Sequence, residues 1–322
     1  MKKTLFSQEA AYKPYLFKGL HGRYAHFPAR SDSGARTFVL VYGQHATLER
    51  VRPIADALTE FGDVYMVDTP GFGGMDPSYK VKEYPSLEFL AAHLNHFVTE
   101  HIPASRQLTL VGISFGFQIL TQALAEYPEL AARTEHAVSF VGFVKYTDFS
   151  MPASYKVFLL HLAAHPARYK AGSLFFTAAL RPGVLRMIFF FNRPFNTKFK
   201  DFDKAQAKEY VDQQIWLWMV NDHRTHGATA WDFFKKNDLT GLRLDADAIH
   251  IGVPNDHLIN NKVVTEELHK MYRHVDVFDL HLPNHAPLDI DSPDKVRALL
   301  PDGLVAMMQT SKNAKALVGE AA

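Results

Sequence analysis

The stretch that most constrains the fold of this chain is LTLVGISFGFQIL, which occupies residues 108–120. Its first residues are apolar and suit a buried strand, whereas the apolar residues from 115 to 127 recur at helical spacing. Ser114 stands between the two patterns, with Gly112 and Gly116 two residues to either side. The sequence therefore predicts a buried strand, a tight turn that carries a serine, and a helix that begins at once.

A serine in such a turn has a defined chemical use. The turn projects the hydroxyl above the carboxyl edge of the sheet, and the small residues Gly112 and Gly116 let strand and helix approach closely. The amide of Phe115 would lie at the amino end of the helix, where it can donate to a developing oxyanion. Ser114 is therefore the candidate nucleophile.

The rest of the chain alternates strand and helix patterns. The expected strands are 37–42, 64–68, 108–112, 137–144, 248–253 and 275–282, preceded by two short strands near the amino terminus. This alternation predicts a mostly parallel sheet covered by helices on both faces. The mostly helical connection between the strands at 137–144 and 248–253 is too long for one crossover helix. We expect a core of residues 1–147 and 246–322 and a helical cap at 148–245.

A nucleophilic serine needs a base and a carboxylate that orients the base. Asp256 follows the expected strand 248–253, in the segment IHIGVPNDHLIN, and His285 follows the next strand, in HLPNHAPLDIDSPDKV. Both would lie on loops at the same edge of the sheet as Ser114. Asp148, after the strand at 137–144, is an alternative for the acid.

Together these residues resemble the α/β-hydrolase family, in which serine, acid and histidine follow one another in this chain order. The resemblance covers residues 37–300 and implies a roughly eight-stranded sheet with a helical cap inserted between the sixth and seventh strands. VDTPGFGGMDPS, residues 67–78, resembles the family's DxPGxGxS segment. Members that dehalogenate substrates or open epoxides carry aspartate at the nucleophile position, so Ser114 argues against both reactions.

YGQHAT, residues 42–47, stands where the family has the HG loop that supplies a second oxyanion amide. The match assigns that amide to Gln44. Tyr42 replaces the usual histidine, which leaves the hydrogen bonds that support the loop unaccounted for. Phe117 occupies a place where many members have a small residue, so we expect looser or differently shaped packing behind the turn.

Composition excludes several other classes. The net charge of +1 argues against a nucleic-acid binder. The absence of cysteine excludes disulfides and a thiolate nucleophile. No pair of histidines has metal-ligand spacing with a carboxylate nearby, and the expected reaction needs neither metal nor cofactor.

No secretory signal is evident in the sequence. The most apolar window, 174–191, is interrupted by Arg181, Pro182 and Arg186. We therefore expect a cytoplasmic protein without a transmembrane helix.

The expected cap is rich in aromatic residues, at 173–195 and in IWLWMV at 215–220. These side chains could roof an apolar pocket over Ser114, which favours a lipophilic ester as substrate. They could equally pack the cap against the core, or form a membrane-facing surface with Arg181 and Arg186 at headgroup level. The sequence thus predicts a serine esterase that acts on a hydrophobic small molecule. A thioesterase, an amide or carbon–carbon bond hydrolase and a non-catalytic binding protein with this fold remain alternatives.

Overall fold

The computed structural model describes residues 12–30, 36–192, 203–254, 256, 258–280 and 292–310. Their strands form an eight-stranded sheet in the order β1-β2-β4-β3-β5-β6-β7-β8. The strands from β3 to β8 are parallel, whereas β1 and β2 form an antiparallel hairpin attached through β4. The predicted mostly parallel sheet is confirmed. The strands are β1 (Tyr12–Phe17), β2 (Leu20–Phe27), β3 (Arg36–Val41), β4 (Asp63–Val67), β5 (Gln107–Ile113), β6 (Thr134–Phe140), β7 (Leu244–Gly252) and β8 (Tyr272–Asp279).

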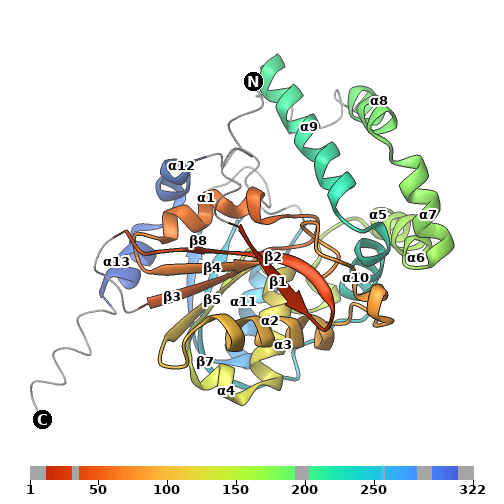
Figure 1. Cartoon of the computed structure of the whole chain (residues 1–322). Helices are drawn as coiled ribbons and strands as arrows, with labels where there is room; N and C mark the ends of the chain where they lie inside the picture. The colour runs from red at the N-terminus through yellow and green to blue at the C-terminus, as the bar shows by residue number, and fades with distance from the viewer. Residues whose placement is uncertain are drawn as a thin grey trace, which may run out of the picture.

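Helices cover both faces of the sheet (Figure 1). α1, α12 and α13 lie over one face, and α2, α3 and α11 lie over the other (Figure 1). A separate apolar cluster fills the space between each helical layer and the sheet. The helices of these layers and the short helix after α3 are α1 (Leu48–Leu58), α2 (Leu87–His101), α3 (Phe115–Glu126), α4 (Pro128–Ala132), α11 (Asn261–Met271), α12 (Pro293–Leu299) and α13 (Asp302–Thr310).

The central strands position the turn of interest. Every residue of β3 is buried, as are five of the seven residues of β5, as expected for parallel strands covered on both faces. β5 pairs with β3 on one side and with β6 on the other. Its carboxyl end, and hence Ser114, lies in the middle of the edge where the parallel strands end.

β6 is displaced from the strand expected at 137–144. It begins at Thr134 and ends at Phe140, because Val141 adopts a positive φ of 46° that a strand cannot continue through. The amide of Val141 donates to the carbonyl of Ile251 at 2.8 Å. The chain therefore leaves the sheet here, four residues earlier than the apolar pattern predicts.

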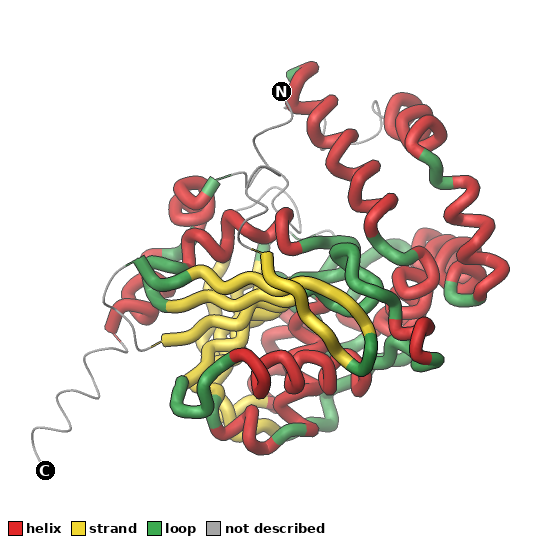
Figure 2. Tube along the Cα trace, in the orientation of Figure 1, coloured by secondary structure: helices red, strands yellow, loops and turns green. Residues whose placement is uncertain are grey.

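A group of helices follows β6 and precedes β7, and it lies beside the sheet (Figure 2). We call residues 146–192 and 203–235 the helical insertion. Its start and its end are joined, since Tyr146 donates to the carbonyl of Asn237 at 3.1 Å and Leu239 to that of Val144 at 3.0 Å. Its elements are η3 (Tyr146–Asp148), α5 (Ala153–Val157), the π-helix η4 (Phe158–Ala164), α6 (His165–Ala167), α7 (Lys170–Ala179), α8 (Pro182–Asn192), α9 (Lys204–Val220) and α10 (His223–Lys235).

Candidate active site

Ser114 occupies the turn between β5 and α3 that the sequence predicts. Its backbone has φ 52° and ψ −118°, a conformation that is strained for a residue with a side chain. The amide of Ser114 donates to the carbonyl of Phe140 at 2.9 Å, and its own carbonyl accepts from the amide of Phe117 at 3.0 Å. These bonds fix the strained turn to the neighbouring strand and to the first turn of α3.

The glycines around this turn leave no room for a side chain. A Cβ on Gly112 would lie 2.5 Å from the Cα of Phe117, and one on Gly116 would lie 2.2 Å from the carbonyl oxygen of Val41. A Cβ on Gly43 would lie 2.9 Å from the carbonyl oxygen of Ile113. The end of β5, the start of α3 and the loop after β3 are therefore in direct backbone contact.

The packing around Phe117 behind the turn is differently shaped, one of the two expected outcomes, and it is not looser. Its side chain is fully buried, and the space that it needs is provided by Gly142, where a Cβ would lie 2.7 Å from the Cβ of Phe117. The ring also packs near Tyr272, with 6.1 Å between the ring centroids. A small residue on the adjacent loop thus compensates for a large one in α3.

The loop after β3 brings Gln44 to the cavity that Ser114 and Phe115 also line. The side-chain amide of Gln44 donates to the carbonyl of His226 at 2.8 Å and to Oγ1 of Thr229 at 2.7 Å. Phe115 is the first residue of α3, so its backbone amide has no acceptor within the helix. The oxyanion role of the backbone amides of Gln44 and Phe115 stays a prediction.

Tyr42 supplies hydrogen bonds that support the loop at the position of the replaced histidine. Its hydroxyl donates to Oδ1 of Asp68 at 3.0 Å and accepts from the amide of Thr69 at 2.9 Å. Arg23 donates to Oδ2 of Asp68 at 2.9 Å and pairs with Glu49 at 2.7 Å. Burial raises the pKa of Asp68 to about 8, while Arg23 acts in the opposite direction. The loops after β3 and β4 are thus joined by a buried polar network.

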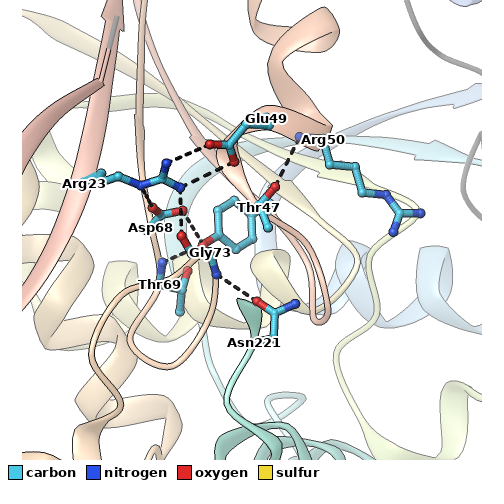
Figure 3. A network of polar contacts seen from close by, with 9 residues as sticks. Arg23, Thr47, Glu49, Arg50, Asp68, Thr69, Gly73 and Asn221 are labelled. Atoms are coloured by element: carbon cyan, nitrogen blue, oxygen red, sulfur yellow. Dashed lines mark hydrogen bonds and ion pairs between the residues drawn. The ribbon is translucent and has the colours of Figure 1, made fainter. Parts of the chain in front are cut away.

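The same network reaches the helical insertion through Gly73 (Figure 3). The amide of Gly73 donates to Oδ1 of Asn221 at 2.8 Å, and its carbonyl accepts from Arg23 at 2.8 Å. The next residue of the insertion, Asp222, donates its amide to the carbonyl of Gly71 at 2.8 Å. The segment between α9 and α10 is therefore attached to the loop after β4.

Asp256 lies on the loop after β7, as predicted. Its Oδ1 accepts from the amides of Leu258 at 2.8 Å and Ile259 at 3.2 Å. Leu258 lines the same cavity as Ser114, which places the Asp256 loop at the cavity wall. His285 lies outside the described residues, so its position relative to Ser114 and Asp256 stays a prediction.

Asp148, the alternative acid, is fully buried and serves its own loop. Its Oδ2 accepts from the amides of Val144 at 2.8 Å and Lys145 at 3.0 Å. Burial raises the pKa of Asp148, and these two amides oppose that shift. The carboxylate therefore already has a structural role at the start of the helical insertion.

A cavity of about 540 Å³ extends from Ser114 beneath the helical insertion. Its size falls within the usual range for small-molecule sites. Most of its wall is apolar. It is lined by Gln44, Ser114, Phe115, Phe143, Phe149, Met151, Ala163, Ala164, Ala167, Phe176, Leu180, Trp218, His223, His226, Gly227, Ala230, Phe233, Phe234 and Leu258.

Two histidines of α10 are polar members of this wall, and the sequence reasoning did not find them. Burial lowers the pKa of His226 to about 4, and it also lowers the pKa of His223. Nδ1 of His223 lies 2.8 Å from Oγ1 of Thr177, whereas Nδ1 of His226 and Nε2 of His223 have no hydrogen-bond partner among the described residues. The motif HRTHG at 223–227 places both rings one helical turn apart, a signal that could have indicated them.

The described residues contain no group of three or more histidine, aspartate or glutamate side chains able to hold a metal ion. No protein-family model matches the sequence, and no curated protein matches it either.

Solved structures match the fold. The enol-lactonase from Burkholderia xenovorans LB400 is 15% identical, with a TM-score of 0.62 over 92% of this chain and 100% of that chain. The esterase from Exiguobacterium antarcticum is 11% identical, with a TM-score of 0.62 over 93% and 99%. The epoxide hydrolase CorEH is 13% identical, with a TM-score of 0.62 over 89% of this chain and 95% of that chain. The chain has the α/β-hydrolase fold, as its resemblance predicts.

Proposed function

We propose that this protein is a serine hydrolase that cleaves a carboxylic ester with a lipophilic acyl group. The observation that supports the proposal most directly is the strained turn of Ser114 at the floor of a largely apolar cavity of about 540 Å³. Strained backbone conformations of this kind cluster at active sites, where the surrounding structure holds them in place. The solved structures that share the fold, among them an esterase and a lactonase, support hydrolysis as the reaction class.

The proposed reaction has two steps. Oγ of Ser114 attacks the ester carbonyl while His285 takes its proton, and the tetrahedral intermediate collapses when His285 passes that proton to the leaving alcohol. Water, deprotonated by His285, then releases the acid from the acyl-enzyme and restores Ser114. Asp256 holds the imidazole in the productive tautomer. The amides of Gln44 and Phe115 stabilise the oxyanion, each contributing roughly 3–4 kcal/mol to the transition state.

The wall of the cavity supports an apolar acyl group. Phe143, Phe149 and Phe233 form one side of it, with ring centroids 4.6 Å to 5.7 Å apart. The lowered pKa values of His223 and His226 favour the neutral form of both rings. The wall therefore presents no charge from these histidines to the substrate.

The first test is labelling with a fluorophosphonate probe and mapping of the adduct by mass spectrometry. We expect an adduct on Ser114 and turnover of p-nitrophenyl esters, and we expect Ser114→Ala to remove both while leaving the circular dichroism spectrum unchanged. Ser86→Ala, at the amino end of α2 and remote from the chemistry, is the control. Wild-type turnover by Ser114→Ala would refute the nucleophile. A folded wild-type protein that takes up no label would favour a binding protein with this fold.

The acid is tested by a matched pair of substitutions. Asp256→Asn should lower kcat by about a hundredfold or more, because the histidine would lose its orienting carboxylate. Asp148→Asn should mainly lower stability, since Asp148 binds the backbone of its own loop. If Asp148→Asn lowers kcat more than Asp256→Asn in folded protein, the acid lies on the other loop. Esters, thioesters and amides of one acyl chain, assayed side by side, identify the bond that is cleaved.

A further inference from the structure

The outward side of α7 and α8 is strongly apolar and exposed. Phe175 is 68% exposed, Phe190 72% and Phe191 67%. Among the α8 side chains that the structure describes, only that of Leu185 is buried. The two helices stand away from the sheet (Figure 1). We call Leu174, Phe175, Met187, Ile188, Phe190 and Phe191 the apolar insertion face.

A helix that exposes so many large apolar side chains is unusual on a surface that meets only water. α7 also has an inner side, because Phe176 and the adjoining Leu180 line the cavity above Ser114. Leu174 and Phe175 point elsewhere and are exposed. α7 is therefore a thin wall between the candidate active site and the apolar insertion face.

The two helices that carry this face are basic, and an acidic side chain of α9, Asp212, pairs with Arg186 at 3.1 Å. Residues 149–192 contain no aspartate or glutamate, although the whole chain has 34 acidic and 35 basic residues. The same segment contains five basic residues, Lys156, Arg168, Lys170, Arg181 and Arg186. Lys170 begins α7 and Arg181 lies between α7 and α8, and both are exposed. Apolar side chains beside exposed cations are complementary to a surface of apolar chains beneath anionic headgroups.

We propose that the apolar insertion face docks onto the surface of an anionic lipid bilayer, with Lys170 and Arg181 at the level of the lipid phosphates. No single described helix is long and apolar enough to cross a membrane, and α7 and α8, which together meet that test, are bent by 71°. α7 and α8 therefore do not form one straight span.

A second copy of this chain fits the face less well than a lipid surface does. A symmetric dimer through this face would place Lys170 and Arg181 of both copies in or beside one interface. The segment 149–192 has no acidic side chain of its own, and Asp212, which reaches it from α9, pairs with Arg186. Anionic phosphates supply the missing countercharge.

Docking would place the outer side of α7 in the headgroup region and its inner side on the cavity. A lipophilic molecule dissolved in the bilayer would then reach the candidate active site with a short path through water. This consequence rests on the proposed function. The docking itself does not, and it is measured on the Ser114→Ala protein so that the two proposals can fail separately.

The experiment is flotation of the full Ser114→Ala chain with phosphatidylcholine vesicles that contain or lack phosphatidylglycerol. We expect association with the anionic vesicles, at least about tenfold weaker association with the neutral ones, and further weakening by salt. Phe175→Ser, Phe190→Ser and Phe191→Ser combined should lower association with anionic vesicles by about tenfold or more. Lys170→Glu combined with Arg181→Glu should lower it to the level of neutral vesicles.

The matched control replaces exposed apolar residues on the core, Leu16→Ser with Val277→Ser, and should float as the parent does. Circular dichroism checks that each variant is folded. A parent that does not float with anionic vesicles, or a folded triple variant that floats equally well, would overturn the proposal. If the parent does not float but sediments as a dimer, and the triple substitution dissociates that dimer, the face joins two copies. This outcome would also overturn the proposal.

Discussion

Gly73 shows how closely individual residues are fitted beside the candidate site. Its φ is +63°, and a Cβ would lie 1.8 Å from Oδ1 of Asp68 and 2.7 Å from the hydroxyl of Tyr42. The next residue, Gly74, has a similar φ of +86°, but a Cβ there would meet only Cγ2 of Val220 at 3.4 Å. This backbone conformation, which glycine adopts readily, accounts for glycine at 74.

Gly73 and Gly74 both have a positive φ, but a Cβ would collide with its surroundings only at Gly73. Alanine at each position therefore separates the cost of the backbone conformation from the cost of the collision. Gly74→Ala should lower the free energy of unfolding by about 1 kcal/mol, through the positive φ alone. Gly73→Ala should lower it by at least about 3 kcal/mol, because the buried pair of Asp68 and Tyr42 must also move. Urea denaturation of both variants measures the difference. Equal losses would show that the Asp68 network yields to a methyl group.

At the scale of elements, the inner and outer sides of the helical insertion should behave differently. Ala163 of η4 lines the cavity, whereas Ala178 of α7 is exposed. If the cavity takes the acyl chain, Ala163→Phe should lower kcat/KM for long-chain p-nitrophenyl esters by about tenfold or more. It should change kcat/KM for the acetate ester by less than about threefold.

Ala178→Phe is the control for added bulk, and it should leave the dependence on chain length unchanged. A folded Ala163→Phe protein with the chain-length profile of the wild type would mean that the acyl group lies elsewhere. Comparing kcat/KM for long-chain and short-chain esters in the same variant distinguishes a filled pocket from a general loss of activity.

Element boundaries also show what the sequence predicted and what it did not. The turn at Ser114 was predictable because strand period, glycines and helix period change within a few residues. The early end of β6 was not, because the positive φ of Val141 belongs to a residue type that rarely adopts it. The roles of His223 and His226 depend on α10 folding back over Ser114, a contact across more than a hundred residues. The exposure of Phe175 and Phe190 was one of three interpretations of the aromatic segment, and the sequence could not choose among them, since apolar character alone predicts burial.

At the scale of the whole molecule, buried neutral histidines should make stability depend on pH. Burial lowers the pKa of His93 to about 3 and those of His226 and His250 to about 4. In the unfolded chain these rings bind protons near pH 6.5. Between these values the unfolded state holds more protons, so the free energy of unfolding falls as the pH falls from about 6.5 toward 4.

His93→Phe tests this at one site that lies far from the cavity, because the phenyl ring keeps the edge contacts with Tyr15 and Phe17. The free energy of unfolding should fall less between about pH 8 and pH 5 in the variant than in the wild type, by roughly 2 kcal/mol. His274→Phe, on an exposed residue, is the control. Asp68, whose pKa is raised, acts with the opposite slope in both proteins and cancels in the comparison. Identical pH profiles would mean that His93 is accessible to protons in the folded state.

The hydrogen bonds that join the two ends of the helical insertion have a wider consequence. Because Tyr146 meets Asn237 and Val144 meets Leu239, the segment between them begins and ends at one point of the core. β6 and β7 are paired directly, so the register of the sheet does not depend on what is inserted there. The sheet is thus independent of the length of the insertion, but the contacts of the insertion with Gly73 and Gln44 join the roof of the cavity to the loops beside Ser114. Any replacement of that roof, in evolution or in design, would have to keep these contacts for the turn to retain its surroundings.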